Sequence, residues 1–192
     1  MKYQKIENIN GVVEASMASD FNLSKDSFYK YMKANNYERV GPGMYVSPDE
    51  FVDELLVLHK RCPIGVISHD EALYYHGLID REALAHTITI YSGYNAGRLN
   101  KSGYKVYYVK RDLLELGKQT VIDQFGNAIP MYDLERTIVD LIRNRSQFEI
   151  QDFITALKAY AGMPNKNLER LSKYAKIFHV EKILRGYLEV LL

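Results

Sequence analysis

The spacing of apolar residues near the start of the chain predicts short helices. Val13, Met17 and Phe21 recur every four residues, so they would share one face of a helix over residues 13–21. A shorter helix is expected over residues 3–8, because the Asn-Gly pair that follows is a common helix stop. The chain therefore begins with two short predicted helices.

A third helix is predicted from Lys25 to about Asn35, with Ser24 as its N-cap. Helical periodicity divides this segment into an apolar face and a polar face. The first face contains Phe28, Tyr31, Met32 and Asn35, and the second contains Asp26, Ser27, Lys30 and Lys33. The turn before Ser24 thus separates two predicted helices.

A hairpin pattern follows these helices. The strand-like runs YERV (37–40) and MYV (44–46) flank a glycine-rich turn at residues 41–43. The glycines and prolines of residues 41–50 interrupt the pattern and mark a domain boundary near Ser47–Pro48. We therefore expect one domain over residues 1–48 and a second over residues 49–192.

The second domain mixes strand and helix patterns. Strands are expected over residues 66–68, 86–91, 104–109, 119–123 and 128–131, and Gly126-Asn127 is typical of a hairpin turn between the last two. Helices are expected from Ser68 to Gly77, from Asp133 to about Asn144, from Ser146 to about Ala161, and over residues 166–178 and 180–191, with capping boxes at Ser68 and Ser146. The predicted fold class is α+β: an N-terminal winged helix-turn-helix followed by a larger mixed α/β domain that ends in a helical segment.

A winged helix-turn-helix of this kind is typical of proteins that bind duplex DNA. Its recognition helix presents polar and basic side chains to the major groove, and the hairpin contacts the neighbouring backbone. The candidate DNA-binding residues are Lys25, Ser27, Lys30 and Lys33 on the helix and Arg39 on the hairpin. Such a unit can also be a module that contacts only protein or RNA.

The distribution of charged residues along the chain is more informative than the net charge. The chain of 192 residues has a net charge of +1, but residues 158–192 carry seven basic and three acidic side chains. Arg170, Lys173 and Lys176 form a stripe that is a candidate basic contact surface for DNA phosphate, RNA or an acidic protein. The alternative, which we favour, is a solvated outer face over an apolar stripe of Leu168, Leu171, Tyr174 and Ala175.

Two polar clusters raise the question of metal or catalytic chemistry. His69 and His76 lie seven residues apart, on one helical face, which would suit a metal site. The neighbouring Asp70 and Glu71 fit the start of a helix instead. A second cluster contains Asp133, Glu135, Arg136 and Asp140, which would suit a nuclease or a nucleotidyl-transfer site. Without a glycine-rich phosphate loop, a helix cap, an ion pair and a solvated face explain that cluster better. We predict no catalytic residue, no metal, no cofactor and no enzymatic activity.

The remaining chemistry indicates a cytoplasmic protein. Cys62 is the only cysteine, so it cannot form an intramolecular disulfide, and we expect an inert buried thiol. The first ten residues lack the apolar core of a signal peptide, and no run of about 18 apolar residues predicts a membrane span.

The chain resembles the AbiEi-type antitoxins of abortive-infection (type IV) toxin–antitoxin systems. The similar stretches are ERVGPGMYVSPDE (38–50), ISHDEALYYHGLID (67–80), MYDLERTIVDLIRN (131–144), ALKAYAG (156–162) and LSKYAK (171–176). They occur in the family's order along essentially the whole chain, and it is this colinear set, rather than any single motif, that is specific.

The resemblance implies a role in phage resistance. It implies an N-terminal winged helix-turn-helix, a C-terminal antitoxin domain and a partner toxin of the nucleotidyltransferase-like AbiEii class, which the antitoxin counters without forming a stable complex. It also implies transcriptional autorepression through inverted repeats in the operon's promoter. The alternative is a winged-helix regulator, or a protein- or RNA-binding module, unrelated to a toxin.

Overall fold

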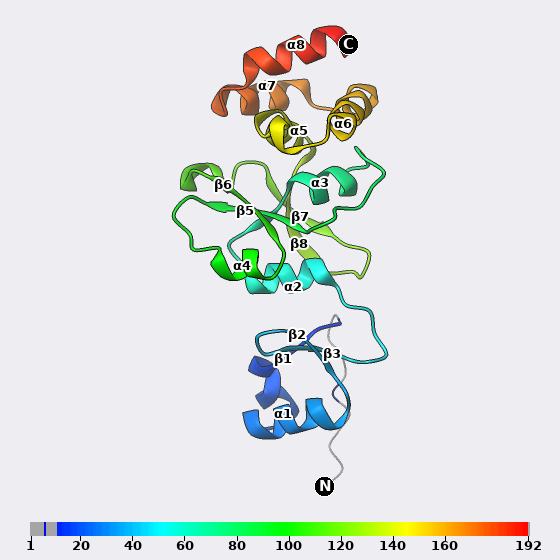
Figure 1. Ribbon diagram of the computed structural model, residues 1–192, viewed down its shortest axis with the longest axis vertical. Helices are drawn as coiled ribbons and strands as arrows, with labels where there is room; N and C mark the ends of the chain where they lie inside the picture. Colours follow the sequence, from blue (N-terminus) through cyan, green and yellow to red (C-terminus); the bar gives the residue numbers. More distant parts are fainter. Residues whose placement is uncertain (1–5, 7–10, 192) are drawn as a thin grey trace. The chain divides into compact units, whose positions relative to one another are not determined.

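The chain folds into two compact units. The computed structural model describes residue 6 and residues 11–191, without the side chains of residues 190 and 191 (Figure 1). One unit comprises Met1–Pro63 and Ile122–Ile129, and the other comprises Ile64–Val121 and Pro130–Leu192. The first unit extends beyond the predicted boundary at residue 48, because it includes a further helix and the tip of a later hairpin. The helix predicted over residues 3–8 lies, apart from Ile6, outside the described residues.

The described part of the first unit contains a three-stranded antiparallel sheet, two α-helices and a 3-10 helix. Its elements are β1 (Val13–Glu14), the 3-10 helix η1 (Ala15–Phe21), α1 (Lys25–Ala34), β2 (Glu38–Gly41), β3 (Met44–Val46) and α2 (Glu54–Arg61). The strand order is β1-β3-β2. The hairpin predicted around residues 41–43 is confirmed, and Gly43 supplies the positive φ of 71° that its turn requires.

The helix predicted over residues 13–21 is wrong in part. Val13 and Glu14 pair with β3 instead, and the backbone N–H of Ala15 donates to the Gly43 carbonyl at 2.8 Å. Because these backbone groups bond the hairpin, they are not available to an α-helix, and the following residues form the tighter 3-10 coil. The apolar spacing alone could not distinguish these two outcomes.

The prediction for α1 is confirmed. Ser24 caps the helix, since its Oγ accepts a hydrogen bond from the backbone N–H of Ser27 at 3.2 Å. Phe28, Tyr31 and Met32 are buried in the core of this unit, whereas Asn35 is exposed beyond the end of the helix. One face of α1 is therefore fixed in the core and the opposite face is left to solvent.

The helix α2 was not predicted from the sequence. Asp53 caps it, because its Oδ1 accepts a hydrogen bond from the backbone N–H of Leu56 at 2.9 Å. The Oδ2 atom of Asp53 accepts from Asn127 at 2.6 Å, which links this helix start to the hairpin tip at Ile122–Ile129. Cys62, which follows the helix, is buried as predicted.

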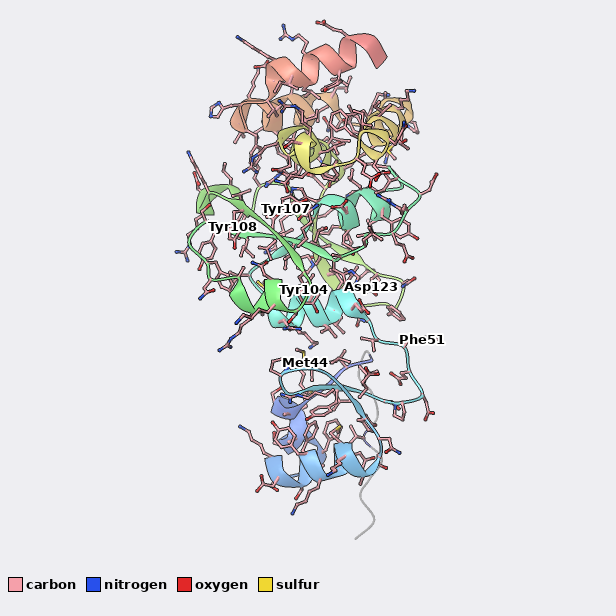
Figure 2. All side chains as sticks on the ribbon, in the orientation of Figure 1. Met44, Phe51, Tyr104, Tyr107, Tyr108 and Asp123 are labelled. Carbon is pink, nitrogen blue, oxygen red and sulfur yellow. The ribbon has the colours of Figure 1, made fainter. Side chains whose placement is uncertain are left out.

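The second sheet has five strands in the order β6-β5-β4-β8-β7 (Figure 1). They are β4 (Val66–Ile67), β5 (Thr87–Tyr91), β6 (Lys105–Val109), β7 (Lys118–Ile122) and β8 (Ala128–Tyr132), close to the predicted ranges. Strand β4 is antiparallel to β5 and parallel to β8, and β5 is parallel to β6. Tyr107 and Tyr108, labelled in Figure 2, alternate along β6: the first is buried and the second is exposed.

The second unit contains several helices, most of which pack around α5. They are α3 (His69–Tyr75), α4 (Gly97–Lys101), α5 (Leu134–Arg143), α6 (Ile150–Gly162), α7 (Leu168–Ile177) and α8 (Glu181–Leu191), with 3-10 turns η2 (Arg111–Leu113) and η3 (Arg145–Gln147). Helix α5 lies among α3, α6, α7 and α8 (Figure 1) and contacts all four. Every residue from Glu135 to Ile142 is buried as a result. The larger mixed α/β domain ending in helices is thereby confirmed. None of the described helices has the length and apolar character needed to span a membrane.

Both predicted capping boxes are wrong. Ser68 precedes α3, but its hydroxyl bonds to Thr89 Oγ1 at 2.8 Å and makes no cap hydrogen bond. Ser146 lies within η3, and α6 begins only at Ile150. In both cases the sequence motif is present, but tertiary contacts or a preceding turn take the place of the cap.

Candidate nucleic-acid interface and buried charge network

The exposed face of α1 carries most of the predicted DNA-binding residues. Lys25, Lys30 and Lys33 are exposed. Ser27 is half-buried, and its hydroxyl accepts from Ser24 Oγ at 2.9 Å within the cap. The three lysine ammonium groups are therefore accessible to an external anion. The Ser27 hydroxyl is instead bonded within the helix cap.

Arg39 lies on β2, in the hairpin that follows α1. It is exposed, and its Nε donates to the Gly41 carbonyl at 3.2 Å, which holds the stem of the side chain along the strand. Because only Nε makes this bond, the two terminal nitrogens of the guanidinium keep donors for an external acceptor.

Two tyrosines connect α1 with the hairpin. Arg39 is directly opposite Tyr45 in the register of β2 and β3. The rings of Tyr45 and Tyr29, which is on α1, have centroids 6.2 Å apart. Tyr29 is 43% exposed, so it extends the polar surface from the lysines toward Arg39. Sequence analysis missed Tyr29, although its position four residues before Lys33 and four after Lys25 places it beside the polar face.

The electrostatics of this surface are only moderately positive. Asp26 is exposed on the same face of α1, and Glu38 is exposed next to Arg39 on β2. These carboxylates reduce the attraction for phosphate, so the surface favours specific contacts at short range over strong long-range steering.

The two histidines of the His69–His76 cluster bond different groups. Nε2 of His69 accepts from the Asn144 side-chain amide at 2.9 Å, whereas Nε2 of His76 donates to the Tyr132 carbonyl at 2.8 Å. Burial lowers the pKa of both rings, and Arg136, Lys105 and Arg143 lower that of His69 further. Each ring is therefore committed to a local protein partner. Of the two carboxylates between them, Glu71 is buried against His86 and Asp70 faces Lys105 at 3.7 Å.

The charged residues of the predicted cluster at α5 are buried, which corrects the predicted solvated face. The predicted cap is confirmed: Asp133 Oδ1 accepts from the backbone N–H of Arg136 at 2.8 Å. Arg136 and Asp140 are both fully buried, and Arg136 Nε donates to Asp140 Oδ2 at 3.0 Å. The guanidinium of Arg136 also stacks on Tyr132, with 3.9 Å between its Cζ and the ring centroid.

The start of α7 is tied to α5 by the remaining charges. Glu135 is buried, and its Oε1 accepts from the backbone N–H of Asn167 at 2.8 Å. Arg170 Nη1 lies 3.5 Å from Glu135 Oε2 and 3.7 Å from Asp133 Oδ2. These contacts fix the first turn of α7 against the start of α5.

The predicted basic stripe is divided by these contacts. Arg170 is half-exposed but turned toward two carboxylates, Lys173 is exposed, and Lys176 lies 4.0 Å from Glu181. Beneath them Leu171, Tyr174 and Ala175 are buried, whereas Leu168 is 44% exposed and does not belong to the apolar stripe. Only Lys173 of the three cations has no ion pair among the described residues.

Comparison with known proteins gives a likeness of fold. No family model matches the chain, and no match was found among functionally described proteins. The crystal structure of the Rv2827c protein from Mycobacterium tuberculosis is similar, with a TM-score of 0.63 at 14% sequence identity. The similarity covers 86% of this chain and 66% of that one. At this identity the likeness shows a shared fold.

Proposed function

We propose that the first unit is a winged helix-turn-helix that binds duplex DNA through α1 and the β2–β3 hairpin. The observation that carries this proposal is the division of α1 into a core face and an exposed face that bears Lys25, Lys30 and Lys33. The Tyr29–Tyr45 contact extends that face to Arg39 on the hairpin, which would act as the wing.

We further propose that the protein is a cytoplasmic antitoxin and autorepressor without enzymatic activity. The colinear resemblance to AbiEi-type antitoxins supports this role, in which the first unit represses the operon and the second counters an AbiEii-type toxin without a stable complex. An enzyme built on Asp133 and Asp140 is less favoured, because Asp140 is fully buried and bonded to Arg136.

DNA binding is tested by fluorescence anisotropy with the promoter repeats and a scrambled duplex, over a series of salt concentrations. We expect tighter binding to the repeats, and we expect Lys30→Ala and Arg39→Ala each to reduce the slope of log K against log salt by about 1. Lys101→Ala is the matched control, because Lys101 is an exposed lysine on α4, in the other unit. Equal binding to both duplexes would contradict specific recognition of the promoter repeats. Unchanged slopes would contradict the assignment of Lys30 and Arg39 as DNA-binding residues.

Antitoxicity is tested separately in cells that carry the toxin. We expect the double variant Lys30→Ala/Lys33→Ala to lose repression of a promoter reporter while still protecting the cells. Protection would be measured as survival after toxin induction, with the antitoxin expressed from an unrelated promoter. A chain that represses the reporter but never protects cells supports the alternative, a transcriptional regulator unrelated to a toxin.

A further inference from the structure

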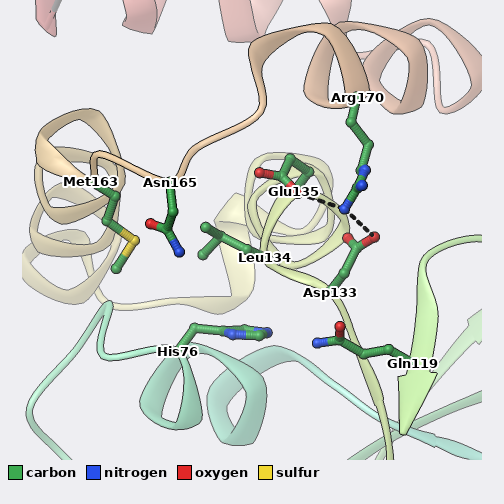
Figure 3. A pocket seen from close by; sticks show the side chains of 8 residues that line it. All are labelled: His76, Gln119, Asp133, Leu134, Glu135, Met163, Asn165 and Arg170. Atoms are coloured by element: carbon green, nitrogen blue, oxygen red, sulfur yellow. Dashed lines mark ion pairs between the residues drawn. The ribbon is translucent and has the colours of Figure 1, made fainter. Parts of the chain in front are cut away.

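A cavity of about 320 Å³ lies in the second unit beside the start of α5 (Figure 3). This volume is at the lower end of the range for small-molecule sites, which is about 300–1,000 Å³. Its polar lining consists of His76, Gln119, Asp133, Glu135, Asn165 and Arg170. These residues come from the end of α3, from β7, from α5 and α7, and from the turn that precedes α7.

The hydrogen-bonding state of His76 is fixed by the backbone. Since Nε2 donates to the Tyr132 carbonyl at 2.8 Å, the neutral ring presents Nδ1 as an acceptor. Burial lowers the pKa of His76, which keeps the ring neutral near pH 7. Nδ1 of this lining residue is therefore an acceptor whose role does not depend on a rotating proton.

The charge of the cavity disfavours an anion. Asp133 and Glu135 are both buried carboxylates, and Arg170 is the single cation that faces them, at 3.7 and 3.5 Å. The carboxylates are also held by protein donors, because Asp133 accepts from Tyr174 and Glu135 accepts from Asn167. A phosphate would meet two negative charges and one positive charge, so the cavity favours a neutral or cationic ligand over an anionic one.

The side-chain amides of Gln119 and Asn165 supply hydrogen-bond donors and acceptors to the cavity. Figure 3 shows the amide of Gln119 directed toward the His76 ring and that of Asn165 directed toward Leu134. Neither amide makes a hydrogen bond to the described part of the chain through its side chain. A primary amide presents an N–H and a C=O side by side, the arrangement that pairs with the edge of a purine base. Leu134 and Met163 provide apolar surface for the face of a flat ring.

We propose that this cavity binds the base of a purine nucleoside, with the amides of Gln119 and Asn165 on its polar edge and His76 Nδ1 as an acceptor. The base lies over Leu134 and Met163, and the ribose faces solvent. The site is in the second unit and is independent of the DNA-binding surface proposed for α1.

The experiment is calorimetric titration of the full-length chain with adenosine and guanosine. The comparison ligands are the pyrimidine nucleoside uridine, the monophosphates AMP and GMP, and the cation agmatine. We expect saturable binding of a purine nucleoside, at least about fivefold tighter than uridine because a pyrimidine lacks the second ring and its edge. We also expect the nucleoside to bind more tightly than its monophosphate, because the carboxylates of Asp133 and Glu135 repel the phosphate. The Nδ1 nitrogen signal of His76 should shift on binding.

Two variants test the amides, with one control. Gln119→Leu and Asn165→Leu remove hydrogen bonding at nearly constant volume on exposed residues, and each should weaken binding at least about fivefold. Gln151→Leu, on the exposed face of α6, should bind as the unchanged chain does. The proposal is overturned if no purine nucleoside binds, if agmatine binds in its place, or if all three variants bind equally well.

Discussion

The side-chain amide of Asn144 donates to Nε2 of His69 at 2.9 Å and to the backbone carbonyl of Asp140 at 3.1 Å. The carbonyl can only accept, which settles the orientation of the amide. Nε2 of His69 therefore accepts, Nδ1 carries the proton, and that proton is donated to Ser68 Oγ at 2.9 Å. The ring also stacks on Tyr107, with centroids 3.3 Å apart. A second proton on this ring, at Nε2, would face the N–H group of the Asn144 amide.

We predict that the protein loses stability as the pH falls through the ordinary range of histidine. Burial, with nearby cations, lowers the pKa of His69 well below its usual 6.5, and burial lowers that of His76. The unfolded chain takes up these protons near pH 6.5, whereas the folded chain does not. The free energy of unfolding is therefore retained above pH 6.5 and falls below it, with a slope of at most about 1.4 kcal/mol per pH unit for each histidine, down to the folded pKa of that histidine.

Urea unfolding between pH 5 and 8 measures this effect. His69→Asn should reduce the slope and leave the contribution of His76, and asparagine tolerates the positive φ of 53° at this position. His179 is the matched control, since it is exposed and has a similar φ of 58°. A slope that His69→Asn leaves unchanged contradicts the prediction.

The buried pair Arg136–Asp140 predicts a strong non-additivity. Arg136→Met should lower the free energy of unfolding by about 3–5 kcal/mol, because it leaves the Asp140 carboxylate buried without its main partner. The double variant Arg136→Met/Asp140→Leu removes both charges and should recover much of that loss. Chemical denaturation of the two single variants and the double variant gives the coupling. Additive losses would show that the two charges do not compensate each other.

Two glycines with similar backbone angles should respond differently to alanine. Gly117 has a φ of 79°, and a Cβ there would lie 2.6 Å from Arg136 Cβ. Gly77 has a φ of 66°, and a Cβ there would meet open space. We expect Gly77→Ala to cost about 1–2 kcal/mol, the cost of the left-handed conformation alone. Gly117→Ala adds overpacking and should cost about 2–5 kcal/mol, measured as the loss in free energy of unfolding.

Tyr29 should contribute to DNA affinity without changing its salt dependence. We expect Tyr29→Phe to weaken operator binding about 2- to 10-fold through loss of one hydroxyl hydrogen bond. The slope against salt should stay constant, since a neutral group releases no counterion. Tyr108→Phe is the control, because Tyr108 is similarly exposed on β6, in the other unit. An equal effect of both substitutions contradicts a specific role for Tyr29.

Local signals in the sequence predicted the elements that local interactions stabilise. Ser24 and Asp133 cap α1 and α5 as expected, and the glycine-rich turn forms the β2–β3 hairpin. Strand ranges in the second unit also agree with alternating apolar residues. The exposed candidates Lys25, Lys30, Lys33 and Arg39 were found for the same reason, because helical and hairpin periodicity places them opposite the core.

Features that depend on distant residues were missed. The charges of α5 suggested a solvated face, but α7 and η2 cover that face, and Arg136 reaches the carbonyls of Leu113 and Leu116. Ser68 has the spacing of a cap, but Thr89 on another strand takes its hydroxyl. The cavity beside Arg170 brings together β7, α3, α5 and α7, and no pattern along the chain indicates that arrangement.

The hairpin tip at Ile122–Ile129 makes the first unit discontinuous in the chain. The polypeptide passes from one unit to the other at three points, after Pro63, after Val121 and after Ile129. A single cut after Pro63 therefore does not release the first unit intact, because Asn127, which holds the Asp53 cap of α2, stays on the other fragment. Removal of one half by gene truncation or by a protease would damage both halves, so point substitutions are the safer means of separating their activities.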